Sequence, residues 1–124
     1  MNYVSIAVLL FGLLLIAAGV YHFVNPKFYD PFMPEWFPKP LANAAGGIAE
    51  IVIGAGLLFP ATRTISLYAA AALMLIFLPL HVIDLLRDRP LMGSKVAATV
   101  RLIVQFLLIY GLWWAARCED CFKG

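Results

Sequence analysis

An acidic side chain, Glu50, lies inside an apolar stretch that carries no other charged residue, residues 41–59. At about 1.5 Å rise per residue, a helix over this stretch is roughly 28 Å long, close to the thickness of a bilayer's hydrocarbon core. A carboxylate near the centre of a membrane helix costs roughly 3 kcal/mol on the insertion scale. This cost is tolerated where the side chain faces protein, water or a ligand, so Glu50 is the first candidate for a functional residue.

Other polar side chains lie at a similar depth in three further apolar segments. His22 ends the first segment, and Arg101 lies near the start of the fourth. If neighbouring segments form antiparallel helices, these groups all fall within roughly 14 Å of one membrane face. We therefore expect one polar site, in which Glu50 and His22 carry the chemistry. The expected ligand-binding residues, which share this end of the molecule, are Arg101, Gln105, His81, Asp84, Tyr21 and Trp36.

Two interpretations of this polar cluster remain open. In the structural interpretation, Glu50 and Arg101 form a buried ion pair, and the nearby His and Gln side chains satisfy its remaining hydrogen bonds. In the functional interpretation, the cluster is a pocket that handles a proton or holds a polar head group. A metal site built from His22, His81 and Glu50 is disfavoured, because no spacing within one helix enforces its geometry and a nearby arginine repels a cation.

The composition is that of an integral membrane protein. The chain has 124 residues, of which 64% are hydrophobic and 13% charged, and its mean hydropathy is +0.92. Soluble domains carry about 25% charged residues. The net charge of +2 comes without a basic cluster, so a nucleic-acid partner is not expected.

The apolar segments predict one all-α domain, an antiparallel bundle of four transmembrane helices. The expected helices cover residues 3–24, 41–59, 64–86 and 96–116, followed by a short tail at 117–124. Residues 25–40 hold five prolines and five aromatic residues, which predict an interfacial cap rather than a long helix. This cap is either a membrane anchor or a lid over the polar site.

The connections between the later helices are short. Residues 60–63 are expected to form a tight turn, and Ser94 is expected to cap the fourth helix. The face that carries the cap has more Lys and Arg than the opposite face, which favours a cytoplasmic location for it.

Cys118 and Cys121 form a C-x-x-C motif in the tail. Such a motif is either a redox dithiol or half of a zinc site. A zinc site needs two more ligands, and both histidines are expected near the opposite face. The two acids between the cysteines disfavour the reactive thiolate form. A redox dithiol and a tail motif without function both remain open.

Several motifs, taken in order, resemble the DoxX-like family of small four-helix membrane proteins. They are the sequences AGVYHFVNP at 18–26, MPEWFP at 33–38, GGIAEIVIGAGLL at 46–58 and RLIVQ at 101–105, together with Pro60 and Arg63. The resemblance implies a four-helix membrane bundle. It also implies that His22, Glu50, Arg101 and Gln105 occupy the family's recurring polar positions, whereas His81 stands where an asparagine is expected.

Some DoxX-like proteins are associated with quinone-linked sulfur oxidation and oxidative-stress complexes, and others with the maturation of partner proteins. We therefore expect a redox-associated accessory protein of the bacterial inner membrane that binds a quinone or similar lipid-soluble molecule. No cofactor motif is present, so electrons would come from a membrane protein partner or from the cysteines. The alternatives are a non-catalytic assembly factor with a structural Glu–Arg network, and a small-solute transporter formed by a homodimer or larger oligomer. Whether the chain is an enzyme stays open.

Overall fold

The computed structural model describes residues 2–118 and 121–122, which fold into helices without any strand. Four helices are long and apolar enough to cross a membrane: α1 (Tyr3–Val24), α3 (Lys39–Leu58), α4 (Pro60–Leu86) and α5 (Lys95–Arg117). The cap holds two short elements, α2 (Pro26–Tyr29) and the 3-10 turn η1 (Asp30–Phe32). The predicted all-α fold with four membrane-spanning helices is confirmed.

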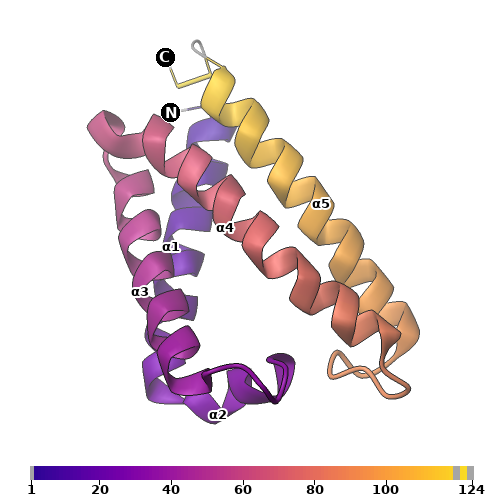
Figure 1. Cartoon of the computed structure of the whole chain (residues 1–124). Coiled ribbons are helices and arrows are strands. Elements are labelled where there is room, and N and C mark those ends of the chain that lie inside the picture. Colours follow the sequence, from indigo (N-terminus) through magenta and orange to yellow (C-terminus); the bar gives the residue numbers. More distant parts are fainter. Residues whose placement is uncertain (1, 119–120, 123–124) are drawn as a thin grey trace.

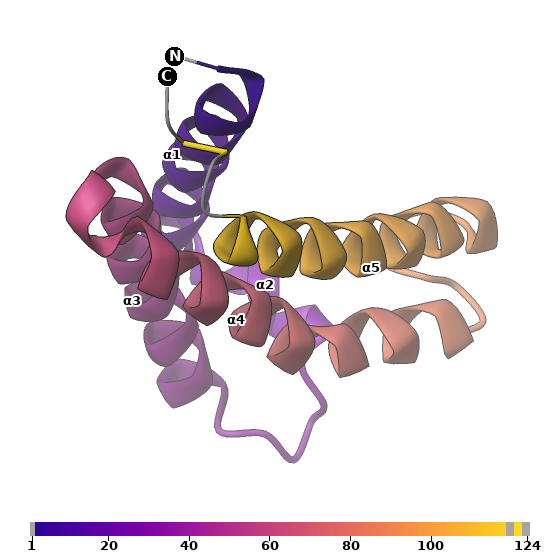
Figure 2. The ribbon, with the colours of Figure 1, turned by 90° about the horizontal axis from the view of Figure 1, so that it is seen from above.

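The four long helices run alternately up and down (Figure 1). Both termini and the α3–α4 junction lie at one end of the molecule, called here the terminal end. The cap and the α4–α5 loop lie at the other end, called here the loop end. Helix α1 packs mainly on α3, and α5 packs mainly on α4, with a smaller contact between α3 and α4. Figure 2 shows that these two helix pairs cross at an angle rather than lying parallel.

Glycines let the backbones of α1 and α3 touch. A Cβ atom added to Gly19 would lie 2.6 Å from the Gly47 carbonyl oxygen, and one added to Gly54 would lie 2.6 Å from the Gly12 carbonyl oxygen. No real side chain fits at such a distance, so these contacts require glycine. Because Gly47 and Gly54 flank Glu50 on one face of α3, the same packing turns Glu50 toward α1.

The helix bounds differ most from expectation at the start of α4. The prediction of a turn over residues 60–63 is wrong, because α4 begins at Pro60, directly after Phe59. Proline suits the first helical turn, where its missing N–H needs no partner. The Arg63 Nε then donates a hydrogen bond of 3.1 Å to the Leu57 carbonyl and so pairs a carbonyl oxygen in the last turn of α3.

The apolar core lies in the half of the bundle nearer the terminal end, where all four long helices contribute. Its largest buried members are Val8, Leu15, Leu57, Leu67, Leu73, Met74 and Leu112. At the loop end, the Ser94 hydroxyl accepts a 3.0 Å hydrogen bond from the Ala97 amide and caps α5, as predicted. Of the candidate polar side chains, His22 and Asp84 lie toward the loop end, whereas Gln105 reaches the apolar core at Met74.

Candidate functional site

His22 and Asn43 hold each other by two hydrogen bonds between α1 and α3. The His22 Nδ1 and the Asn43 Oδ1 lie 2.7 Å apart, and the Asn43 Nδ2 donates to the His22 carbonyl over 2.7 Å. This carbonyl has no helical donor, because the residue four positions later is Pro26, which has no N–H. Both side chains are buried, with about a twentieth of their surface exposed. The Asn43 amide thus satisfies the unpaired His22 carbonyl at the end of α1 and also fixes the orientation of the imidazole.

The two bonds also define which nitrogen of His22 carries a proton. Since the Asn43 Nδ2 donates to a carbonyl, the amide presents its oxygen to the imidazole, and the His22 Nδ1 must donate. A neutral imidazole with a proton on Nδ1 has a bare Nε2, which is an acceptor. In the neutral ring, the Nε2 of His22 is therefore the nitrogen that can accept a hydrogen bond from Glu50.

Glu50 lies on the Nε2 side of this imidazole. Its Oε1 is 3.4 Å from the His22 Nε2, and its Oε2 has no hydrogen-bond partner among the residues that the structure describes. Glu50 is 6% exposed and lies near the middle of α3. Because Nε2 is an acceptor in the neutral ring, the two groups share one proton, either as carboxylic acid and imidazole or as carboxylate and imidazolium. The arrangement is a carboxyl–imidazole pair that can accept or release a proton inside the membrane.

Tyr29 of the cap covers the other face of the imidazole. Its ring stacks on His22 with a centroid distance of 3.6 Å and an angle of 10°. Its hydroxyl donates a 3.1 Å hydrogen bond to the Ala18 carbonyl. Burial, followed by the nearby Glu50 and Tyr21, raises the pKa of Tyr29 to about 12. The phenol therefore stays protonated at neutral pH, and the cap lies directly on the His22 side of the pair.

Gly46 of α3 lies between the His22 imidazole and the ring of Phe77 on α4. A Cβ atom added to Gly46 would lie 3.6 Å from the His22 Cε1 and 3.9 Å from the Phe77 Cζ. These are ordinary van der Waals distances, so a methyl group would fit beside the ring. Through the Phe77 ring, the α4–α5 helix pair thus comes close to the His22 imidazole.

Arg101 belongs to a second polar group, between α4 and α5. Its Nη1 donates a 2.9 Å hydrogen bond to the Gln105 Oε1, and the Gln105 Nε2 donates a 2.7 Å bond to the Met74 carbonyl. Within residues 2–118, no ion pair joins Arg101 to Glu50, whose partner is His22. The Glu50–Arg101 ion pair of the structural interpretation is therefore wrong. The depth of both residues was predicted, but the helices pair as α1–α3 and α4–α5, which divides the polar residues into two groups.

His81 lies on α4, within electrostatic range of Arg101 and Asp84. Its Nδ1 is buried and makes no hydrogen bond to any described atom. It is a second imidazole inside the membrane, and the structure does not connect it by a hydrogen bond to His22 or Glu50.

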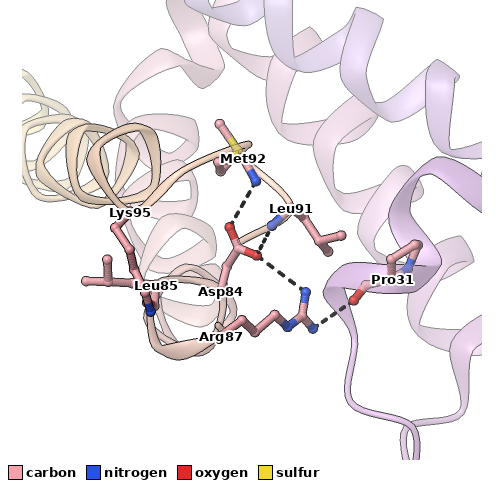
Figure 3. Close-up of polar contacts among 7 residues, drawn as sticks. All are labelled: Pro31, Asp84, Leu85, Arg87, Leu91, Met92 and Lys95. Carbon is pink, nitrogen blue, oxygen red and sulfur yellow. Dashed lines mark hydrogen bonds and ion pairs between the residues drawn. The ribbon is translucent and has the colours of Figure 1, made fainter. Parts of the chain in front are cut away.

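Asp84 organises the α4–α5 loop (Figure 3). Its carboxylate accepts hydrogen bonds from the Leu91 amide over 2.7 Å and the Met92 amide over 3.3 Å, and it pairs with the Arg87 Nη1 over 3.4 Å. The Arg87 Nη2 donates in turn to the Pro31 carbonyl of the cap over 2.8 Å. Both oxygens of Asp84 thus hold the loop and, through Arg87, the cap, and its expected ligand-binding role stays a prediction.

The two aromatic candidates lie outside the carboxyl–imidazole pair. The Tyr21 hydroxyl accepts a 3.0 Å hydrogen bond from the Asn25 Nδ2 at the end of α1. Trp36 is 80% exposed and contacts the ring of Phe37. The structure therefore places both at the surface of the cap region, where Trp36 suits an interfacial anchor.

The cysteines of the tail form a disulfide bond, Cys118–Cys121. The side-chain amide of Asn2 donates to the Cys121 carbonyl, which joins the start of α1 to the tail. The disulfide lies at the terminal end, whereas His22 lies at the end of α1 nearest the cap. A redox role for this pair stays a prediction.

Sequence reasoning missed Asn43 and the specific role of Tyr29. Asn43 lies four residues before Gly47 and seven before Glu50, so all three share one face of α3. That spacing was a usable signal for a polar residue directed at α1. No pattern in the sequence singles out Tyr29 from the other aromatic residues of the cap.

The fold and site define an integral membrane protein with four spanning helices and a buried carboxyl–imidazole pair. Residues 11–117 match the model of a family described as "Domain of unknown function (DUF8561)", and the chain belongs to this family. Comparison with curated proteins found no match, and comparison with solved structures found none either. The matched residues include the carboxyl–imidazole pair and end immediately before Cys118.

Proposed function

We propose that this protein is a redox-associated accessory protein of the membrane, in which Glu50 and His22 exchange a proton with a lipid-soluble carrier such as a quinone. The bacterial inner membrane is the proposed location. One observation carries the proposal. Glu50 is buried inside a spanning helix, with one carboxyl oxygen 3.4 Å from the His22 Nε2 and the other without a partner among the described residues.

Quinone chemistry suits this arrangement because reduction of a quinone to a quinol takes up two electrons and two protons. The unpartnered Oε2 of Glu50 is free to face a quinol hydroxyl or quinone carbonyl, while Oε1 exchanges the proton with the His22 Nε2. The hydrogen bond from Nδ1 to Asn43 keeps Nε2 directed at the carboxyl during that exchange. Electrons pass to or from a membrane protein partner, since the chain has no recognisable cofactor motif.

The remaining polar residues have supporting places in this proposal. Arg101 offers guanidinium donors for a carbonyl or anionic head group on the α4–α5 side, and Gln105 holds it by accepting one of its hydrogen bonds. His81, whose Nδ1 lacks a described partner, is a second proton acceptor at the same end of the bundle. The stacked Tyr29 places the cap where it limits access of water to His22.

A non-catalytic assembly factor is the rival proposal, and one observation favours it. Both hydrogen bonds of Asn43 serve to join α1 to α3, and the glycine contacts do the same. In this case the carboxyl–imidazole pair would fix helix register without chemistry. The two proposals differ in what removal of the Glu50 charge does to ligand binding and to stability.

The experiment compares Glu50→Gln with the parent protein and with Glu35→Gln, the same change on an exposed residue of the cap. Each purified protein is titrated with decylubiquinone in lipid nanodiscs, and its thermal unfolding is recorded without the quinone. We expect Glu50→Gln to weaken quinone binding by at least about tenfold, the effect of one lost charge-assisted hydrogen bond, at nearly unchanged stability. Glu35→Gln should match the parent in both measurements.

The rival proposal gives the opposite result. If neither the parent nor Glu50→Gln binds the quinone, and Glu50→Gln unfolds at a lower temperature, the pair is structural and the proposed function is wrong. Equal quinone binding by the parent and Glu50→Gln would show that Glu50 has no role in binding the quinone.

A further inference from the structure

A second site lies at the terminal end, the end of the molecule opposite the cap that covers His22. There the start of α4, the end of α5 and the tail enclose a surface pocket of about 600 Å³. The polar and aromatic side chains that line it are Arg63, Thr64, Tyr68, Arg117 and Phe122, with Cys118 beside them. None of these residues takes part in the proposed proton exchange.

Two guanidinium groups dominate the chemistry of this pocket. Among the described residues that line it, Arg63 and Arg117 are the charged ones, and no carboxylate is present. Glu119 and Asp120, the nearest acids in the sequence, lie outside the described residues. The pocket wall therefore presents two positive charges and the hydroxyl groups of Thr64 and Tyr68.

Both guanidinium groups are held in place by aromatic rings. Arg63 lies 5.3 Å from the ring centroid of Phe122, and its Nε is bonded to the Leu57 carbonyl. Arg117 lies 4.6 Å from the ring centroid of Trp113. Stacking and hydrogen bonding restrict side chains that are otherwise long and flexible. Less entropy is then lost when these groups bind an anion.

The pocket lies at the depth at which lipid head groups are expected. It lies where α4 begins and α5 ends, hence at the boundary of the membrane. Tyr68, which lines the pocket, and Trp113, on which Arg117 stacks, are 44% and 43% exposed, as expected for aromatic residues at an interface. An amphiphile can thus place its chains along the apolar helix surface and its head group in the pocket.

We propose that this pocket binds a phosphate-bearing anion, in its natural setting the head group of an anionic phospholipid. The planar guanidinium groups of Arg63 and Arg117 match phosphate oxygens in charge and in hydrogen-bonding geometry. The disulfide Cys118–Cys121 contributes by closing the turn of the tail that brings Phe122 over Arg63. The two cysteines thereby act as positioning residues for the pocket wall.

The test uses the full chain, purified in a neutral detergent. Native mass spectrometry measures retention of dioleoyl-phosphatidylglycerol, of dioleoyl-phosphatidylcholine, and of either lipid in the presence of inorganic phosphate. We expect the anionic lipid to be retained about tenfold more strongly than the zwitterionic one. Arg117→Gln should remove most of this preference, and Arg89→Gln, the same change on an exposed residue at the loop end, should keep it.

Two further variants keep the test decisive. Arg63→Gln should also lose the preference for the anionic lipid. If this variant does not fold because its bond to the Leu57 carbonyl is lost, Arg117→Gln decides the test. Arg117 makes no such backbone bond in the described structure. The double variant Cys118→Ser and Cys121→Ser should bind the anionic lipid more weakly than the parent; equal binding would end the positioning role of the disulfide.

The phosphate arm identifies the source of the anion. If inorganic phosphate binds on its own and displaces the anionic lipid, the pocket takes phosphate from either source. If it does neither while the lipid preference holds, the lipid is the ligand. Equal retention of both lipids without phosphate binding would overturn the proposal, as would an equal loss in Arg89→Gln and Arg117→Gln.

Discussion

Replacement of Asn43 by leucine tests how the site is built. The change removes both 2.7 Å hydrogen bonds to His22 and leaves two buried groups without partners, the His22 Nδ1–H and the His22 carbonyl. The carbonyl has no alternative donor in the helix, because Pro26 follows at the position that would supply one. The effect should therefore appear both in stability and in the chemistry of the imidazole.

The magnitude follows from the two bonds. Hydrogen bonds between membrane helices contribute roughly 0.6 to 1.7 kcal/mol each. Loss of both should lower the free energy of unfolding by about 1–3 kcal/mol. The matched control is Asn25→Leu, which removes a single bond between exposed side chains, Asn25 and Tyr21, and should cost below about 0.5 kcal/mol.

The assay is reversible unfolding in a mixed detergent series, followed by circular dichroism and repeated for both variants. A loss for Asn43→Leu no larger than that for Asn25→Leu would refute the reasoning. It would mean that the helix pair owes its stability to the glycine contacts and that His22 is not held by Asn43.

Three further predictions concern packing, the cap and the loop. Gly19→Ala should cost about 1–3 kcal/mol in the same assay, because its Cβ meets the Gly47 carbonyl oxygen at 2.6 Å, whereas Gly111→Ala, with nothing within 4 Å, should be neutral or stabilising. Tyr29 should ionise near pH 12 rather than 10.0 in an ultraviolet titration, and Tyr29→Phe should lack this step. Because the pKa of Tyr29 is higher in the folded than in the unfolded protein, its contribution to stability holds below pH 10 and is lost as the pH rises toward 12. Asp84→Ala should speed hydrogen exchange of the two loop amides that bind its carboxylate, and unchanged exchange would contradict its role in the loop.

Much of the fold was predictable because the bilayer imposes it. Each spanning helix needs about 20 apolar residues, and the sequence shows four such runs, so helix number and order follow directly. The start of α4 was placed too late, at residue 64, because Pro60 was taken as part of a turn when it is the first residue of the helix. Proline suits both a turn and the first residue of a helix, so Pro60 alone does not distinguish the two.

The candidate site was predictable in part. Glu50 and His22 could be identified because a polar group in an apolar helix is costly, and the structure brings them together. The pairing of Glu50 with Arg101 in the structural interpretation rests on depth alone, and the structure does not form it. Depth in the membrane follows from position in the sequence, but the pairing of helices depends on how their surfaces fit, here on the backbone contact between Gly19 and Gly47.

The most direct measurement is the ¹⁵N nuclear magnetic resonance spectrum of His22, recorded in a His81→Gln background so that one histidine remains. We predict that the neutral ring of His22 carries its proton on Nδ1 and is bare on Nε2, and that Asn43→Leu loses this fixed tautomer. A neutral ring protonated on Nε2 and bare on Nδ1 would contradict this, because Nδ1 could then not donate to the Asn43 Oδ1 and Nε2 could not accept a proton from Glu50.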